Sequence, residues 1–237
     1  MEASRRAMLL GFSGVALSSL GLGGCERDQR QVASARKFAY GPGAAGSRPL
    51  QATDVRGPYA GASAPPATCR LTEPNIEGPY YRSGAPHTAT LAGAAYTRGV
   101  PLALSGRVLS ADCRSPLAGV VVDVWQANAD GHYDNDGSPG MDPKGFHFRG
   151  LVETDATGRY GLSTIVPGRY LNGPRYRPAH IHVKLSAAGH APLTTQLYFP
   201  DDPFNEGDPF IRKSLVIDIE GKDEKRGSYD FVLAPSA

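Results

Sequence analysis

Two histidines one residue apart, His180 and His182, are the first candidates for chemistry in this sequence. They lie in the segment 175–187, RYRPAHIHVKLSA, which we expect to form a β-strand. Successive side chains of a strand point to opposite faces, so both imidazoles project from one face while Ile181 points to the other. Two imidazoles side by side on a strand are a common way to hold a metal. A structural or surface pair is the alternative, and the spacing alone does not decide between them.

Tyrosines cluster around the histidine pair in the sequence and are candidates for further ligands. Tyr133 follows the turn NADGH, Tyr170 follows VPG, and Tyr176 lies just upstream of the histidines. A phenol has a pKa of about 10, so it ligates as an anion at neutral pH only beside a strong Lewis acid. Phenolate is a hard anion, and two phenolates with a hydroxide would neutralise ferric iron, Fe(III). The residues therefore predict ferric iron, and strand parity leaves Tyr170 and Tyr176 as alternatives.

A zinc hydrolase built on the same histidine pair is a competing interpretation. Zinc prefers imidazole, thiolate and carboxylate ligands. The remaining histidines, His87, His132, His147 and His190, all fall in expected loops or turns. Since no third ligand or general base is placed beside the pair, the sequence disfavours zinc.

The body of the chain alternates short apolar runs with turn signals. Runs such as LALSGRVLS (102–110), VVVDVWQA (120–127) and LTTQLYF (193–199) recur at a spacing of roughly ten residues. This pattern predicts an all-β fold, an antiparallel β-sandwich, with long functional loops at 134–146 and 200–210. Small sandwiches also serve as spacers or binders, so the strands alone leave a non-catalytic binding module of the cell envelope as the alternative.

The N-terminal residues differ in composition from the body. Residues 1–24 contain the paired Arg5 and Arg6 and an apolar run too short for a membrane span, which is typical of a twin-arginine signal peptide. The run ends in LGGC, which resembles a bacterial lipobox and predicts lipidation of Cys25. An ordinary signal peptide with a chance cysteine is the alternative.

Residues 25–66 are rich in Ala, Gly, Ser, Pro and Arg and predict a flexible tether ahead of a catalytic domain at 67–237. We therefore expect an exported periplasmic or cell-envelope lipoprotein that meets the membrane only through its lipid anchor. Cys69 and Cys113 form an even pair in that oxidising compartment and predict a disulfide, with two buried thiols as the alternative. The net charge of +2 offers no reason to expect a nucleic-acid partner.

From about Cys69 to Phe231 the sequence resembles the intradiol ring-cleavage dioxygenases, the family of catechol 1,2- and protocatechuate 3,4-dioxygenases. Within that family it resembles a secreted, lipoprotein-type branch, because it has an export signal and no added helical dimerisation region. The resemblance is carried by five motifs: EGPYY (77–81), VDVWQANADGHYDN (122–135), TIVPGRY (164–170), RPAHIH (177–182) and TTQLYF (194–199).

The resemblance implies a non-haem Fe(III) enzyme that cleaves a catecholic ring between its two hydroxylated carbons with O2, giving a muconate-type diacid. Its partners would be a small catecholic substrate and O2. The resemblance leaves open whether the chain forms a homo-oligomer. Two of the motifs look nearer to the protocatechuate type, so a protocatechuate-like substrate is expected. The implied iron ligands are Tyr133, Tyr170, His180 and His182, which leaves Tyr176 a structural role.

The resemblance also implies roles for residues around the metal. Tyr170 would leave the metal and accept a proton when substrate binds, and Arg177 would stabilise the carbanion-like substrate. The alternative for Arg177 is an ion pair with an acidic loop residue such as Asp134. Gln196 matches a glutamine that hydrogen-bonds near the active site.

Three residues are expected to contact the substrate. Pro79 and Tyr80 match a segment that lines the pocket mouth, and Arg149 is a candidate to meet a substrate carboxylate.

Overall fold

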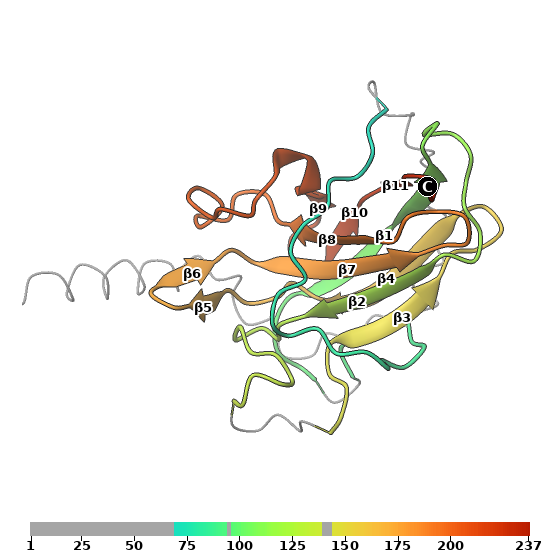
Figure 1. The fold of residues 1–237 in the computed structure, drawn as a ribbon. Coiled ribbons are helices and arrows are strands. Elements are labelled where there is room, and N and C mark those ends of the chain that lie inside the picture. Colours follow the sequence, from blue (N-terminus) through green and yellow to red (C-terminus); the bar gives the residue numbers. More distant parts are fainter. Residues whose placement is uncertain (1–68, 94–95, 139–143) are drawn as a thin grey trace, which may run out of the picture. The chain divides into compact units, whose positions relative to one another are not determined.

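The computed structural model of the chain describes residues 69–93, 96–138 and 144–237 (Figure 1). The expected signal peptide, Cys25 and the expected tether lie outside the described residues. Within the described ranges, regular structure other than strand is confined to the 3₁₀ turn η2 (Lys213–Leu215), so the all-β prediction is confirmed. No helix within these ranges is long and apolar enough to cross a membrane.

One layer of the fold is a four-stranded sheet that carries the histidine pair. Its strands run in the order β3 (Arg149–Glu153), β2 (Val121–Gln126), β7 (His180–Ser186) and β8 (Leu193–Tyr198). All three pairings are antiparallel, as predicted.

The second layer is organised around β1 (Pro101–Ser110), which pairs antiparallel with β4 (Arg159–Ile165). On its other edge β1 pairs with β10 (Lys225–Ser228) and β11 (Phe231–Leu233), and both of these pairings are parallel. A third C-terminal strand, β9 (Asp218–Glu220), extends the sheet beyond β10. The parallel pairs depart locally from the antiparallel prediction, because these C-terminal strands reach β1 by a long crossover and not by a tight hairpin.

A small hairpin of β5 (Tyr170–Asn172) and β6 (Arg175–Arg177) projects beyond the end of the four-stranded sheet at which β7 begins (Figure 1). The expectation of one continuous strand over 175–187 is wrong. Pro178 has no N–H to donate, and the strand is split there into β6 and β7.

The hydrophobic core lies between the two layers. Four inward side chains of β2 and β7 are almost completely buried: Val122, Val124, Ile181 and Val183. They share one cluster with apolar residues of the other layer, among them Leu102, Leu104, Leu162 and Phe231. This core covers one face of the four-stranded sheet. The residues that alternate with the core residues along each strand therefore form the opposite face, which is polar and aromatic.

A disulfide joins Cys69 to Cys113, with the two Cα atoms 5.6 Å apart. It attaches the first described residue to the connection between β1 and β2.

Candidate active site

The two histidines of β7 are buried side by side on the polar face of the four-stranded sheet, with 2% and 1% of their surface exposed. Nδ1 of His180 lies 2.7 Å from the carbonyl oxygen of Pro178, so Nδ1 donates and Nε2 keeps its lone pair. The ring of His182 stacks on Trp125 at 4.8 Å between centroids and 10° between planes. Among the described residues, neither ring nitrogen of buried His182 has a hydrogen-bond partner, so either one is available to bind a metal.

The electrostatics of the site keep both imidazoles neutral. Burial, and then the charge of Arg177, lowers the pKa of His180 to about 3. Burial, and then neighbouring His180, lowers the pKa of His182 well below its usual value. Neutral imidazole is the form that binds metals, so both rings are ready to ligate at neutral pH.

The two tyrosines predicted as ligands converge on the histidines. The hydroxyl oxygen of Tyr133 lies 3.5 Å from Nε2 of His180, and Tyr133 is buried. The ring centroid of Tyr170 lies 5.6 Å from that of Tyr133 and 5.5 Å from that of His180. Tyr170 is only half-buried. The four side chains thus meet at one place, and Tyr170 is the member that reaches towards solvent.

Two glycines allow the loops that carry the tyrosines to meet. A Cβ on Gly168 would lie 2.4 Å from the backbone nitrogen of Gly131, and a Cβ on Gly131 would lie 2.1 Å from the carbonyl oxygen of Arg169. A hydrogen bond of 2.8 Å from the Gly168 amide to the Asn128 carbonyl joins the same loops. Any side chain at either glycine would force the loops, and therefore the two phenols, apart.

Tyr176 lies elsewhere, although its strand parity matched that of the histidines. Its ring packs on Phe204 at 5.4 Å between centroids. The parity argument failed because the strand is interrupted at Pro178. The geometry therefore favours Tyr170 over Tyr176.

A strap of residues 73–82 covers the polar face of the sheet. Gly78 passes directly over His182, because a Cβ there would lie 3.3 Å from Cε1 of that ring. Tyr80 stacks on Tyr133, with centroids 4.4 Å apart and an interplanar angle of 17°. The strap therefore closes the site from the side opposite the core.

Polar contacts fasten the strap to the sheet. The hydroxyl of Tyr81 donates to Asp123 Oδ2 at 3.0 Å, and Lys184 Nζ donates to Glu77 Oε2 at 2.8 Å. Pro79 is exposed on the strap next to Tyr80.

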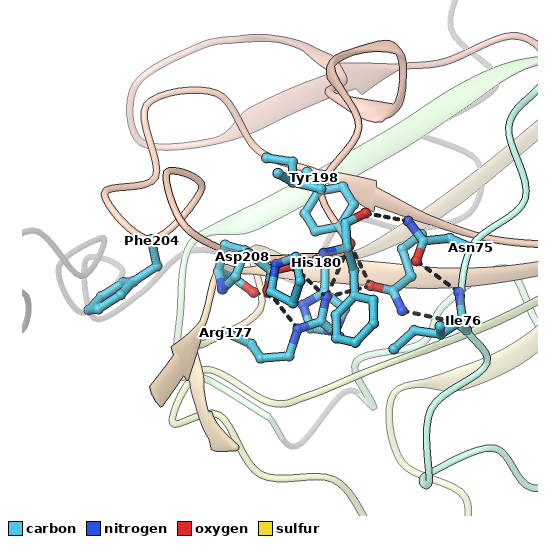
Figure 2. A network of polar contacts seen from close by, with 12 residues as sticks. Asn75, Ile76, Arg177, His180, Tyr198, Phe204 and Asp208 are labelled. Carbon is cyan, nitrogen blue, oxygen red and sulfur yellow. Dashed lines mark hydrogen bonds and ion pairs between the residues drawn. The ribbon is translucent and has the colours of Figure 1, made fainter. Parts of the chain in front are cut away.

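Arg177 is the centre of a buried polar network (Figure 2). Its Nε donates to Asp208 Oδ2 at 2.8 Å, and its Nη2 donates to Gln196 Oε1 at 2.9 Å and to the Tyr198 hydroxyl at 3.1 Å. Gln196 also accepts from the Tyr198 hydroxyl at 2.8 Å and donates to the carbonyl oxygen of Ile76 on the strap. Gln196 thus ties Arg177 to the strap.

Asp134, the carboxylate considered as a partner for Arg177, pairs with Arg149 instead. Nε of Arg149 lies 2.8 and 2.9 Å from the two oxygens of Asp134, and Nη2 donates to Asn135 Oδ1 at 2.9 Å. Both members of the ion pair are buried. Arg149 therefore already has a carboxylate of this chain as a partner, while its Nη1 has no hydrogen-bond partner among the described residues.

The donor set suits a hard trivalent ion better than zinc. In the described part of the chain, no three His, Cys, Asp or Glu side chains gather as a metal site. What does gather is two phenols and two neutral imidazoles, and phenol oxygens match a hard trivalent cation.

Several residues of the site were missed by the sequence-based predictions, among them Trp125, Asp202 and Asp208. Trp125 shares the face of His182 across the β2–β7 pairing, a neighbour that register alone would reveal. Asp202 and Asp208 come from the loop 200–210, which was expected to be functional without any residue being singled out.

Known proteins are similar to this chain in sequence and in fold. The family model described as Dioxygenase matches residues 76–235. The chain is 35% identical over 187 residues to 6-chlorohydroxyquinol 1,2-dioxygenase of Cupriavidus pinatubonensis, covering 70% of this chain and 65% of that protein. It is 35% identical to catechol 1,2-dioxygenase of Acinetobacter baylyi, covering 70% of this chain and 59% of the relative. The chain thus spans less than two thirds of the length of these two relatives.

Solved structures of dioxygenases are also similar to this chain. The dioxygenase domain of a dioxygenase–carbohydrate-binding protein fusion from Streptomyces sp. SirexAA-E is 40% identical, with a TM-score of 0.62 and coverage of 70% of this chain and all of that one. The 3-chlorocatechol 1,2-dioxygenase of Rhodococcus opacus is 32% identical, with a TM-score of 0.64 and coverage of 70% and 73%. The chain belongs to the intradiol dioxygenase family.

Proposed function

We propose that this protein is an Fe(III)-dependent intradiol dioxygenase. It cleaves the ring of a small catecholic substrate between the two hydroxylated carbons with O2 and yields a muconate-type diacid. The observation that carries this proposal is the convergence of Tyr133, Tyr170, His180 and His182 on one buried point.

The ligand set explains the choice of metal. Burial, and then the neighbouring Tyr170, raises the pKa of Tyr133 well above its usual value, so this phenol ionises only beside a strong Lewis acid. The two imidazoles are neutral, and the two phenolates supply negative charge for a trivalent ion. When bound, ferric iron would supply the Lewis acidity that binds and activates the diol.

The residues around the metal have distinct tasks. Tyr133 is buried under Tyr80 and holds a fixed position, whereas half-buried Tyr170 can move and take a proton on its phenol oxygen from the entering diol. Arg177 presents a buried positive charge that stabilises negative charge on the substrate ring. Gln196 holds that guanidinium in place.

Two observations favour different substrates, one with a carboxylate on the ring and one without. The motifs RPAHIH and WQANADGHYDN favour a protocatechuate-like diol. Buried Arg177 already pairs with Asp208, which favours a ring without a carboxylate, although Arg149 shares its partner Asp134 with Arg82. The similar proteins include relatives named for both kinds of substrate. Some are named for catechol, chlorocatechol or hydroxyquinol, and one is a protocatechuate 3,4-dioxygenase beta chain that is 41% identical over 122 residues.

Oxygen uptake by the iron-loaded protein tests the function and ranks the substrates. Catechol, protocatechuate and hydroxyquinol are each supplied, and the products are identified by mass and absorption. We expect equimolar consumption of O2 and diol, with a ring-opened diacid as the product. Binding of the diols by the iron-loaded protein without any uptake would support the non-catalytic binding module instead.

We also propose that the protein is exported and anchored by a lipid on Cys25. The LGGC motif and the Cys69–Cys113 disulfide support this address. The full chain should partition with membranes, and Cys25→Ser should move it to the soluble fraction. A wild-type protein that is itself soluble would contradict the anchor.

A further inference from the structure

The loop between β8 and η2 supplies two buried carboxylates to the site. The side chains of Asp202 and Asp208 are 0% and 2% exposed, and each forms an ion pair with an arginine next to the ligand-bearing elements. Burying a carboxylate is costly unless its oxygens are fully hydrogen-bonded, so the partners of these two residues indicate what each one holds.

Asp202 connects the chain beside one ligand to the chain beside another. Its oxygens accept from Nε of Arg169 at 3.0 and 2.8 Å and from the backbone amide of Ala179 at 3.0 Å. Arg169 directly precedes Tyr170, and Ala179 directly precedes His180. One carboxylate thus joins the two residues that directly precede ligands on different strands, Arg169 through its side chain and Ala179 through its backbone amide.

Asp208 holds a different group. It accepts from Nε of Arg177 at 2.8 Å and from the amide of Phe210 at 2.7 Å. The ring of Phe210 lies under the same guanidinium, with 4.8 Å from Arg177 Cζ to the ring centroid. The carbonyl of Phe210 in turn accepts from Asn75 Nδ2 at 2.8 Å, which fastens this end of the loop to the strap (Figure 2).

We propose that Asp202 and Asp208 are positioning residues with separate tasks, an inference that rests on the proposed function. Asp202 sets the spacing of Tyr170 and His180 around the metal. Asp208 sets the orientation of Arg177 towards the substrate. If both carboxylates merely stabilised the fold, removing either charge would have the same kind of effect on metal retention and on turnover.

The substitutions Asp202→Asn and Asp208→Asn form a matched pair, because each removes one buried charge from the same loop without changing its size. Each variant is compared with the wild type for retention of iron against a chelator, for kcat and KM, and for the melting temperature of the metal-free protein. Asp202→Asn should weaken iron retention about 10- to 100-fold. Asp208→Asn should retain iron and the visible tyrosinate-to-Fe(III) charge-transfer absorption expected of the proposed ligand set, while kcat and kcat/KM fall together, on the order of tenfold or more.

The separation of the two effects decides the inference. It is overturned if both variants lose iron equally, or if Asp202→Asn retains iron as the wild type does. Should Asp202→Asn fail to fold, Arg169→Lys replaces it, since lysine keeps the charge but lacks the Nε–H group that Asp202 accepts from. That variant should also lose iron faster than the wild type, and unchanged retention would overturn the inference. A wild type that holds no iron would overturn the proposed function, and this inference with it.

Discussion

Burial has opposite consequences for the two kinds of ligand in this site. It keeps the imidazoles of His180 and His182 unprotonated and so ready to bind a metal. It keeps the phenol of Tyr133 protonated, because burial raises the pKa of that hydroxyl well above its usual value. Binding of the proposed iron must therefore expel a proton from Tyr133, and affinity for the metal should rise with pH.

Substitution of a single phenol tests this assignment. Tyr133→Phe removes one anionic ligand while keeping the ring that stacks under Tyr80, so we expect loss of iron and of visible colour with the fold retained. Iron content and the absorption spectrum are measured together with circular dichroism. Tyr176→Phe is the matched control, because Tyr176 packs on Phe204 and should keep both iron and colour. Full iron occupancy in Tyr133→Phe would reject the assignment.

The depressed pKa of His180 makes the stability of the metal-free protein depend on pH. The unfolded chain binds a proton at this histidine near pH 6.5, whereas the folded chain does so only near 3. Stability is therefore fully present above the unfolded pKa and is lost as pH falls towards the folded one, by about 1.4 kcal/mol per pH unit.

Urea unfolding of the metal-free protein at pH 7 and pH 5 measures this effect. We expect His180 alone to account for a loss of about 2 kcal/mol between the two values. The slope should decrease in His180→Gln, where the titrating group is gone. An unchanged slope in that variant would show that other groups are responsible.

At the scale of the elements, the site depends on two loops that touch through glycine. Gly168→Ala would put a Cβ 2.4 Å from the backbone nitrogen of Gly131, an overlap that backbone movement must relieve. We expect a loss of about 1–3 kcal/mol or more in the free energy of unfolding, together with weaker iron binding, because the two phenols move apart. Gly93→Ala is the control, since a Cβ there meets no atom of the described residues within 4 Å. Equal behaviour of the two variants would contradict the role given to this crossing.

Local pattern in the sequence was enough to predict the strands and the shared face of His180 and His182. It was not enough for the strand break, because the parity rule was extended across Pro178, where the ladder cannot continue. It could not identify Asp202 or Asp208 either. Their partners Arg169 and Arg177 lie about thirty residues upstream, and only the folded loop brings them together.

At the scale of the whole molecule, the strap 73–82 closes the site and the disulfide fixes the chain just before it. The bond between Cys69 and Cys113 spans a sequence separation of 44. Closing a loop of that size stabilises a folded chain by about 4 kcal/mol on the chain-entropy model.

Replacing both cysteines by serine should therefore lower the free energy of unfolding by up to about 4 kcal/mol. Chemical denaturation of the double variant and of the wild type, each with and without reductant, measures the difference. The reductant should destabilise the wild type alone. A wild type that is equally stable with and without reductant would contradict a structural role for the disulfide.

The most direct test of the metal centre is the resonance Raman spectrum of the purified wild-type protein after its iron has been quantified. We expect equimolar iron and tyrosinate vibrations enhanced by excitation into a visible tyrosinate-to-Fe(III) charge-transfer band. A protein with equimolar iron but no such vibrations would show that phenols do not ligate the metal, and the proposed set of Tyr133, Tyr170, His180 and His182 would be wrong.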